Sequence, residues 1–157
     1  MNRIILFLLL IIPAGMAAQQ RVVVAGDGSG DFKTIQEAIN SLPDSAALPR
    51  TIFIKKGSYQ EKLFIKKHNL ILEGEGREQT FITYSIARDE WRCDHPDDWG
   101  VATMNVQGND ITLKNLAVIN SFGFNFSGDY TVPCKADTTG KKTITIRSHQ
   151  MALRTMY

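Results

Sequence analysis

The chain has 157 residues, a formal net charge of +2, 43 % hydrophobic residues and 22 % charged residues. This composition is that of a globular protein and excludes disorder for most of the chain. The lysines are scattered over several predicted loops, which excludes the clustered basic surface of a nucleic-acid-binding protein. A mildly basic chain is compatible with a polyanionic partner, but solvated loop lysines are the simpler explanation of the charge.

Residues 1–18 are predicted to be a secretory signal peptide. Arg3 precedes the unbroken apolar run Ile4–Ile12, and small residues follow up to a cleavage site after Ala17 or Ala18. The apolar run is shorter than the roughly 20 residues that a membrane-spanning helix needs. We therefore expect an exported protein, periplasmic or extracellular, with no membrane association after cleavage. A membrane-anchored N-terminus is the alternative.

The mature part, residues 19–157, is predicted to be one domain. It opens with a β-branched strand, Arg21–Val24, and a glycine-rich segment, Ala25–Phe32. The glycines suggest a phosphate-binding loop, but the Gly-Lys-Ser/Thr ending of a P-loop is missing. Lys33 also occupies the position of the third glycine in a GxGxxG motif. A tight turn is therefore predicted.

An amphipathic helix is predicted for Thr34–Leu42. Its isoleucine, alanine and leucine residues fall on one helical face, and Thr34 and Glu37 form a Thr-x-x-Glu capping box. Pro43 follows directly and ends the helix, because a proline removes a backbone donor and clashes with the preceding turn.

Short strands are predicted in five alternating, β-branched runs, which are Thr51–Lys55, Leu63–Lys66, Asn69–Glu73, Thr80–Ser85 and Thr143–Ile146. None of them is long enough to bury a face alone. Stacked coils would bury one continuous interior of isoleucine, leucine and valine, and would leave an outer face suited to an extended polymer.

The segment Ala102–Ser121 has two alternating apolar strands around a Gly-Asn-Asp turn. A single hairpin would have a similar sequence, but the recurrence of the pattern upstream indicates a parallel β-helix. The helix Thr34–Leu42 is predicted to cover the N-terminal open end of this β-helix. Asn115 and Asn120 are assigned to its turns, since asparagine tolerates a left-handed backbone.

The segment Ala87–Gly100 is longer than a coil turn requires and carries two tryptophans among acidic residues. Trp91 and Trp99 are candidate substrate-binding residues, because aromatic rings suit the apolar faces of pyranose sugars. The alternative is that both rings pin the loop to the body of the β-helix.

Cys93 and Cys134 lie in loop-like sequence of an exported chain, where oxidation is permitted. A disulfide and two free thiols are both open, because two cysteines alone do not define a disulfide framework. A metal site formed by Cys93, Asp94 and His95 is disfavoured, since adjacent residues point in different directions.

Three segments occur in order along the chain: Asp27–Ile39, the Gly-x-Tyr-x-Glu motif at Gly57–Glu61, and Ala102–Ser121. Together they resemble the pectin methylesterase family. The resemblance covers residues 19–157 and implies a right-handed parallel β-helix, all-β apart from a short capping helix. It also implies an enzyme that hydrolyses the methyl esters of pectin to methanol and pectate, with no metal or organic cofactor. We expect the protein to be a monomer.

In that family one aspartate attacks the ester, a second acts as acid and base, and glutamines stabilise the oxyanion. The aspartates lie in QDTL-like and DFIFG-like motifs, which do not occur in these 157 residues. We therefore expect the N-terminal portion of a catalytic domain, incomplete at its C-terminus and inactive by itself.

The segment His149–Arg154 is similar to the family's HQAVALR motif, which makes Gln150 the candidate oxyanion donor. The segment is one residue shorter than that motif, and a one-residue slip within a strand would put His149 in its place. A surface strand residue with no catalytic role is the alternative for Gln150.

Two other classes of function are open. One is a non-catalytic glycan-binding stub. The other is a different pectinolytic β-helix enzyme, a lyase or a polygalacturonase, which is disfavoured because no carboxylate cluster suited to calcium is evident in the sequence.

Overall fold

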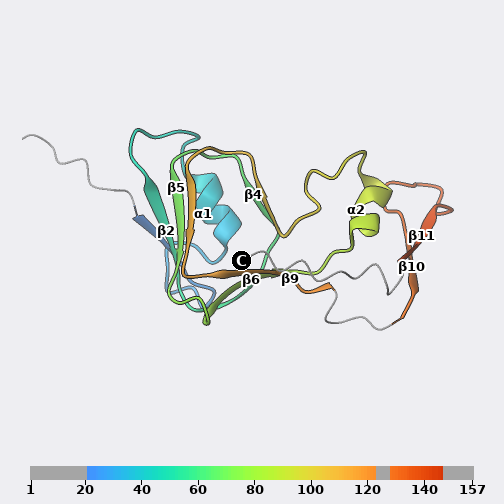
Figure 1. Cartoon of the computed structure of the whole chain (residues 1–157), viewed down its shortest axis with the longest axis horizontal. Coiled ribbons are helices and arrows are strands. Elements are labelled where there is room, and N and C mark those ends of the chain that lie inside the picture. Colours follow the sequence, from blue (N-terminus) through green and yellow to red (C-terminus); the bar gives the residue numbers. More distant parts are fainter. Residues whose placement is uncertain (1–20, 123–127, 147–157) are drawn as a thin grey trace, which may run out of the picture.

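The structure is a computed structural model that describes residues 21–122 and 128–146. These residues form a parallel β-helix that is followed by a β-hairpin (Figure 1). In chain order the elements are β1 (Arg21–Val24), α1 (Ile35–Ser41), β2 (Arg50–Ile54), β3 (Gly57–Gln60), β4 (Leu63–Ile65), β5 (Leu70–Gly74), β6 (Thr80–Tyr84), α2 (Arg88–Asp94), β7 (Met104–Val106), β8 (Ile111–Lys114), β9 (Ala117–Asn120), β10 (Tyr130–Pro133) and β11 (Thr143–Ile146). Neither helix in the described ranges has the length and apolar character to cross a bilayer.

Successive coils add strands to three parallel sheets. The strand orders are β1-β2-β5-β8, β3-β6-β9 and β4-β7. In the first sheet Ile52 lies opposite Leu72, which lies opposite Leu113. This topology confirms the predicted parallel β-helix. The strands predicted between residues 51 and 85 match β2, β4, β5 and β6 to within one residue at each end.

The core lies inside the coils and is filled by alternate residues of the strands. Leu63 and Ile65 are fully buried, whereas Phe64 between them is partly exposed. The same alternation holds for Ile52 and Ile54 around Phe53. Because side chains alternate between the two faces of a strand, each coil contributes one row to the core and one row to the outer surface.

Residues 102–121 form three strands in place of the two that the sequence pattern predicts. Strands β7, β8 and β9 join three different sheets, so the Gly-Asn-Asp turn is a corner of the coil. The left-handed residues Asn69 (φ 51°) and Asp110 (φ 56°) stand at equivalent corners, before β5 and β8. Asn115 (φ 52°) makes the next corner, which confirms its assignment to a turn.

The predicted helix is present and covers the N-terminal end of the β-helix, as expected. The N–H of Glu37 donates to the hydroxyl oxygen of Thr34 (3.3 Å), and Ile35 and Ile39 are buried in the core. The Gln36 amide accepts a hydrogen bond from the Phe64 N–H (2.9 Å) and donates to the Phe64 carbonyl (3.2 Å). A side-chain amide of α1 thus occupies the backbone groups of β4 that a neighbouring strand would otherwise use.

Glu61, the last residue of the Gly-x-Tyr-x-Glu motif, holds the start of α1. Its two carboxylate oxygens accept hydrogen bonds from the N–H groups of Ile35 and Gln36, both at 2.9 Å. These are two of the backbone donors that a helix N-terminus leaves without partners. Tyr59 of the same motif is 5 % exposed and packs in the core. The motif therefore fastens the capping helix to the second coil.

Glu61→Ala is expected to lower the free energy of unfolding by about 2–3 kcal/mol, because two helix N–H groups lose a charged acceptor. Urea denaturation followed by circular dichroism measures the change. Glu78→Ala is the matched control, since Glu78 is exposed and lies in a turn. Equal stability of the two variants would contradict this role of Glu61.

Two further elements differ from the sequence-based expectations, besides the unpredicted strands β3 and β10. The run Thr143–Ile146 is a strand, but it pairs antiparallel with β10 and adds no strand to the three parallel sheets. The alternation of β-branched residues specifies a strand and not its partner, which is why the prediction is wrong on this point. Helix α2 occupies part of Ala87–Gly100, where only a loop is predicted.

Candidate functional site

The segment between β6 and β7 packs on the outer side of the chain around β4. Lys62 and Phe64 are two residues apart in extended chain, so both side chains point away from the buried Leu63. Trp91 lies against Lys62 and Trp99 lies against Phe64. Both candidate tryptophans thus lie on the outer side of the chain at the start of β4.

Trp91 belongs to α2 and is held by several contacts. Its indole stacks on the His95 ring, with centroids 3.5 Å apart and planes 4° apart. Its Nε1–H donates to the Asp97 carbonyl (3.0 Å), and the Lys62 ammonium lies 3.8 Å from its ring centroid. The ring also lies directly against Gly100, where an added β-carbon would be 2.5 Å from the indole. These contacts tie the loop together and to β4.

Trp99 keeps a large free surface. Its side chain is 39 % exposed, and its ring meets Phe64 edge-on, with centroids 6.4 Å apart and an interplanar angle of 62°. The Trp99 N–H donates to the Asp97 carboxylate (2.9 Å), which fixes the backbone before Gly100. Trp99 and Phe64 together form an aromatic surface, which we call the aromatic shelf.

Lys62 is the residue of this site that the sequence analysis does not single out. Its ammonium is buried and has no hydrogen-bond acceptor among the described residues. Burial lowers the pKa of Lys62 from 10.5 to about 8, partly offset by the charge of Glu90. The Tyr84 ring lies 5.4 Å from the same nitrogen. A lysine before a strand is common in any sequence, so only the three-dimensional packing reveals it.

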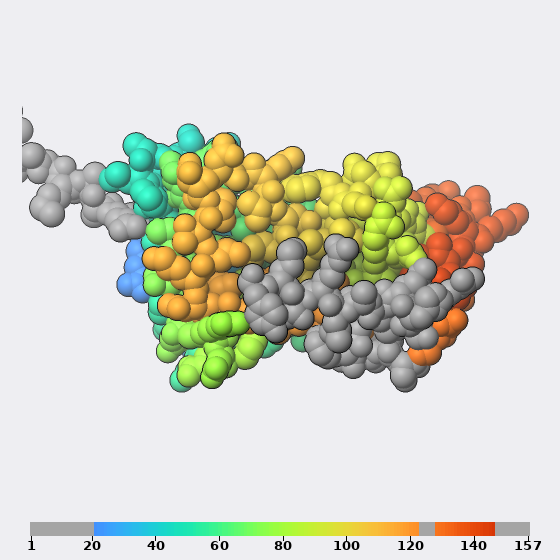
Figure 2. Space-filling model, in the orientation of Figure 1, coloured from blue at the N-terminus to red at the C-terminus, as the bar shows by residue number. Residues whose placement is uncertain are grey.

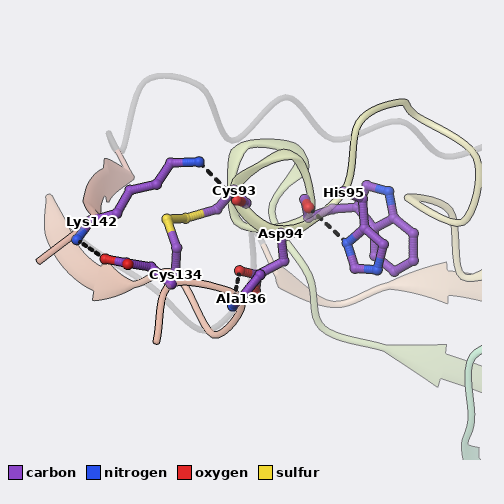
Figure 3. The surroundings of a disulfide bond; sticks show 8 residues. Cys93, Asp94, His95, Cys134, Ala136 and Lys142 are labelled. Carbon is purple, nitrogen blue, oxygen red and sulfur yellow. Dashed lines mark hydrogen bonds between the residues drawn. A yellow bond between two sulfur atoms is a disulfide. The ribbon is translucent and has the colours of Figure 1, made fainter. Parts of the chain in front are cut away.

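Cys93 and Cys134 form a disulfide, which settles the alternative that the sequence leaves open (Figure 3). Their Cα atoms are 5.4 Å apart, and the bond joins α2 to the loop after β10. The Lys142 ammonium donates to the Cys93 carbonyl (3.1 Å), and the Ala136 N–H donates to the Asp94 carboxylate (2.8 Å). This last hydrogen bond lowers the pKa of Asp94.

The ligand atoms of Cys93, Asp94 and Cys134 lie within 4.8 Å of one another, but both sulfurs belong to the disulfide and are therefore not thiolate ligands. The His95 ring faces Trp91, with Nδ1 3.0 Å from the Trp91 carbonyl. The structure therefore gives no support to a metal site at these residues.

Helix α2, β10 and β11 make up a second, smaller packed body, which we call the α2–hairpin unit. Its core consists of Ala87, Phe122 and Ile146 with partly buried side chains of β10 and β11. Figure 2 shows the residues of α2 lying against those of β10 and β11, to one side of the β-helix coils. The Asn120 amide joins this unit to the β-helix, since it donates to the Ile86 carbonyl (2.9 Å) and accepts from the Phe122 N–H (3.1 Å).

Gln150 and His149, the candidates for the oxyanion donor, lie outside the described residues. The structure therefore brings Trp91 and Trp99 together with Lys62 and Phe64, and it describes no geometry between these residues and Gln150.

Comparisons with known proteins decide the family. The sequence model of the family described as Pectinesterase matches residues 21–157. The chain belongs to the pectinesterase family. A probable pectinesterase/pectinesterase inhibitor of Arabidopsis thaliana is 32 % identical over 143 residues, which are 84 % of this chain and 25 % of that protein. A pectinesterase of Petunia integrifolia is 37 % identical over 108 residues, 68 % of this chain and 28 % of that protein.

Solved pectin methylesterases have the same fold. One in complex with a hexasaccharide has a TM-score of 0.56 and 29 % identity, and the match covers 79 % of this chain and 36 % of that chain. The enzyme from carrot has a TM-score of 0.56 and 32 % identity over 68 % of this chain and 33 % of that chain. The fold of this pectinesterase family member is therefore a right-handed parallel β-helix. The chain spans about a quarter of the curated relatives and about a third of the solved structures.

Proposed function

We propose that this chain is the N-terminal portion of an enzyme that hydrolyses the methyl esters of pectin to pectate and methanol. The observation that carries the proposal is the match of the pectinesterase family model over residues 21–157. The hexasaccharide bound to a solved pectin methylesterase of the same fold supports a pectin chain as the ligand. The proposed reaction needs no metal or organic cofactor.

In the proposed mechanism Gln150 donates a hydrogen bond from its neutral amide to the oxyanion that forms when the ester is attacked. A carboxylate is a weak nucleophile, so it needs a neighbouring acid and preorganised donors for the developing charge. The nucleophilic aspartate and the acid/base aspartate are proposed to come from sequence beyond these 157 residues. Residues 19–157 alone are therefore proposed to be inactive.

Gln150→Ala in the enzyme extended by the QDTL-like and DFIFG-like segments is expected to lower kcat about 10²- to 10³-fold, the usual effect of removing one oxyanion donor. Methanol release from methyl-esterified pectin measures the rate, and sequencing of the gene past the codon for Tyr157 supplies the longer form. Rapid methanol release by purified residues 19–157 would show that a carboxylate already present, such as Asp94, Asp97 or Asp98, performs the chemistry.

The aromatic shelf is the proposed contact for the sugar rings. Trp99→Ala is expected to weaken the binding of methylated oligogalacturonate roughly three- to tenfold, because one exposed aromatic face is lost. Leu48→Ala is the control, since Leu48 is a large apolar residue that is 52 % exposed in the loop before β2. Isothermal titration calorimetry measures both, and an unchanged affinity of the Trp99 variant would remove the shelf from the binding site.

A glycan-binding protein without catalysis is the second candidate. The specific observation in its favour is that the exposed Trp99 already pairs with the partly exposed Phe64 within the described residues. Binding of methylated oligogalacturonate without methanol release, together with a stop codon directly after Tyr157, would favour this candidate.

We also propose that the chain is exported as a monomer, with residues 1–18 removed. The disulfide Cys93–Cys134 supports export, because disulfides persist in oxidising compartments. N-terminal sequencing of the secreted protein should begin directly after Ala17 or Ala18, and size-exclusion chromatography should give the mass of a single chain. A retained N-terminus in the membrane fraction would favour an anchored protein.

A further inference from the structure

Lys62 is held in a way that a surface lysine is not. Its ammonium is buried without a hydrogen-bond acceptor among the described residues and lies 3.8 Å from the Trp91 ring centroid. Glu90 of α2 is the charged group that acts on it most directly, Tyr84 of β6 faces it at 5.4 Å, and His95 stacks on the same indole. The indole is therefore the main partner of this cation.

Gly100 links the contact between Lys62 and Trp91 to the position of Trp99. Gly100 is buried and has a positive φ (98°), and the Trp91 ring fills the space that a side chain at this position would need. The residue before Gly100 is Trp99, whose ring lies on Phe64. The loop is thus held at two points on the outer side of the chain at β4, where Trp91 contacts Lys62 and Trp99 contacts Phe64.

We propose that Lys62 is a positioning residue, which holds Trp91 against Gly100 and so presents the exposed Trp99 ring beside Phe64 for contact with the pectin sugar. The sugar as ligand rests on the proposed function, whereas the effect of Lys62 on the two tryptophans does not. The reacting ester is not touched by Lys62 in this proposal.

The free-energy cost of burying the charged Lys62 favours a positioning role for this residue over a stabilising one. The folded state lowers the pKa of Lys62 from 10.5 to about 8, so between these values the unfolded chain binds more protons and the stability rises as the pH rises. The charged ammonium is therefore kept in the fold at a cost below about pH 8. Lys62→Met, which keeps the length and removes the charge, should leave the melting temperature unchanged or raise it.

Intrinsic fluorescence tests the positioning directly, because the chain has only two tryptophans, Trp91 and Trp99. In Trp99→Phe the emission of Trp91 alone is expected to change with one midpoint near pH 8 as Lys62 loses its proton. Adding Lys62→Met should abolish this transition. His95→Gln in the same background removes the imidazole that stacks on the Trp91 ring and should leave the transition in place.

Affinity for methylated oligogalacturonate, measured near neutral pH with Trp99 present, is the second readout. Lys62→Met should weaken binding roughly tenfold. Lys62→Arg should keep most of the affinity and lose the fluorescence transition, because arginine stays charged. Lys66→Met, the same change at an exposed lysine, should alter neither.

The two readouts separate the two proposals. A transition near pH 8 that depends on Lys62, with no glycan binding by the wild-type chain, would keep Lys62 as the anchor of Trp91 and reject the glycan as ligand. Unchanged emission and unchanged affinity in Lys62→Met would overturn the role of Lys62, while binding by the wild-type chain would leave the proposed function intact. If Lys62→Met does not fold, Lys62→Arg decides, because a fluorescence transition that persists there cannot come from Lys62.

Discussion

Leu72→Ala is expected to lower the free energy of unfolding by about 3–5 kcal/mol, because it opens a cavity at the centre of the stacked coils. Leu72 is fully buried in β5, between Ile52 of β2 and Leu113 of β8 in the same row of the sheet. Neighbouring coils are held in register by their strand pairing, so the cavity cannot close without shifting a whole strand. Urea denaturation monitored by circular dichroism measures the loss.

Leu113→Ala is the matched control for this substitution. Leu113 occupies the next position of the same row but is 46 % exposed, whereas Leu72 has no exposed surface. Removing its side chain should therefore cost at most about 1 kcal/mol. Equal losses for the two variants would mean that the row is not a continuous core and that the coils do not stack as described.

The coils could be predicted from the sequence because their information is local. A buried residue such as Ile52 or Leu63 alternates with an outward residue, and Asn, Asp or Gly stands at several corners, so strand positions follow from a period of two. The capping helix could also be predicted, since Thr34 and Glu37 mark its start and Pro43 follows its end. In both cases the residues that decide the structure are neighbours in the chain.

The partners of the elements could not be predicted in the same way. Strand β11 has the alternation of a coil strand and pairs instead with β10, and the sequence pattern of residues 102–121 does not tell a hairpin turn from a coil corner. Helix α2 starts without a side-chain cap at Ala87, so it lacks the signal that identified α1. Its position depends on contacts with β11 and on a disulfide to a residue far along the chain.

The candidate site could likewise be predicted only in part from the sequence. Trp91 and Trp99 could be selected by residue type alone, but their different surroundings depend on packing with Lys62 and Phe64, which lie well before them in the sequence. No sequence motif identifies Lys62. Its burial, without an acceptor among the residues that the structure describes, arises only when α2 packs over it. The role of Gln150 stays a prediction from the motif similarity.

Replacing both cysteines, Cys93→Ser with Cys134→Ser, is expected to destabilise the α2–hairpin unit by about 4 kcal/mol. The disulfide closes a loop with a sequence separation of 41, and chain entropy sets a gain of this size for such a loop. Among the described residues the core of the unit is small, because Ala87, Phe122 and Ile146 are the buried residues of this cluster apart from the cysteines. The β-helix core is separate from it and should be much less affected.

The two tryptophans make this prediction measurable within one protein. Trp91 belongs to α2 and Trp99 follows it in the same segment, so their fluorescence reports how α2 and the residues after it are attached. Far-ultraviolet circular dichroism reports mainly the strands of the β-helix. In the double variant the fluorescence transition should move to lower urea concentration and separate from the dichroism transition. Dithiothreitol should produce the same separation in the wild-type chain and have no effect on the double variant. Coincident and unshifted transitions in the double variant would mean that α2 keeps its place on the β-helix without help from the disulfide.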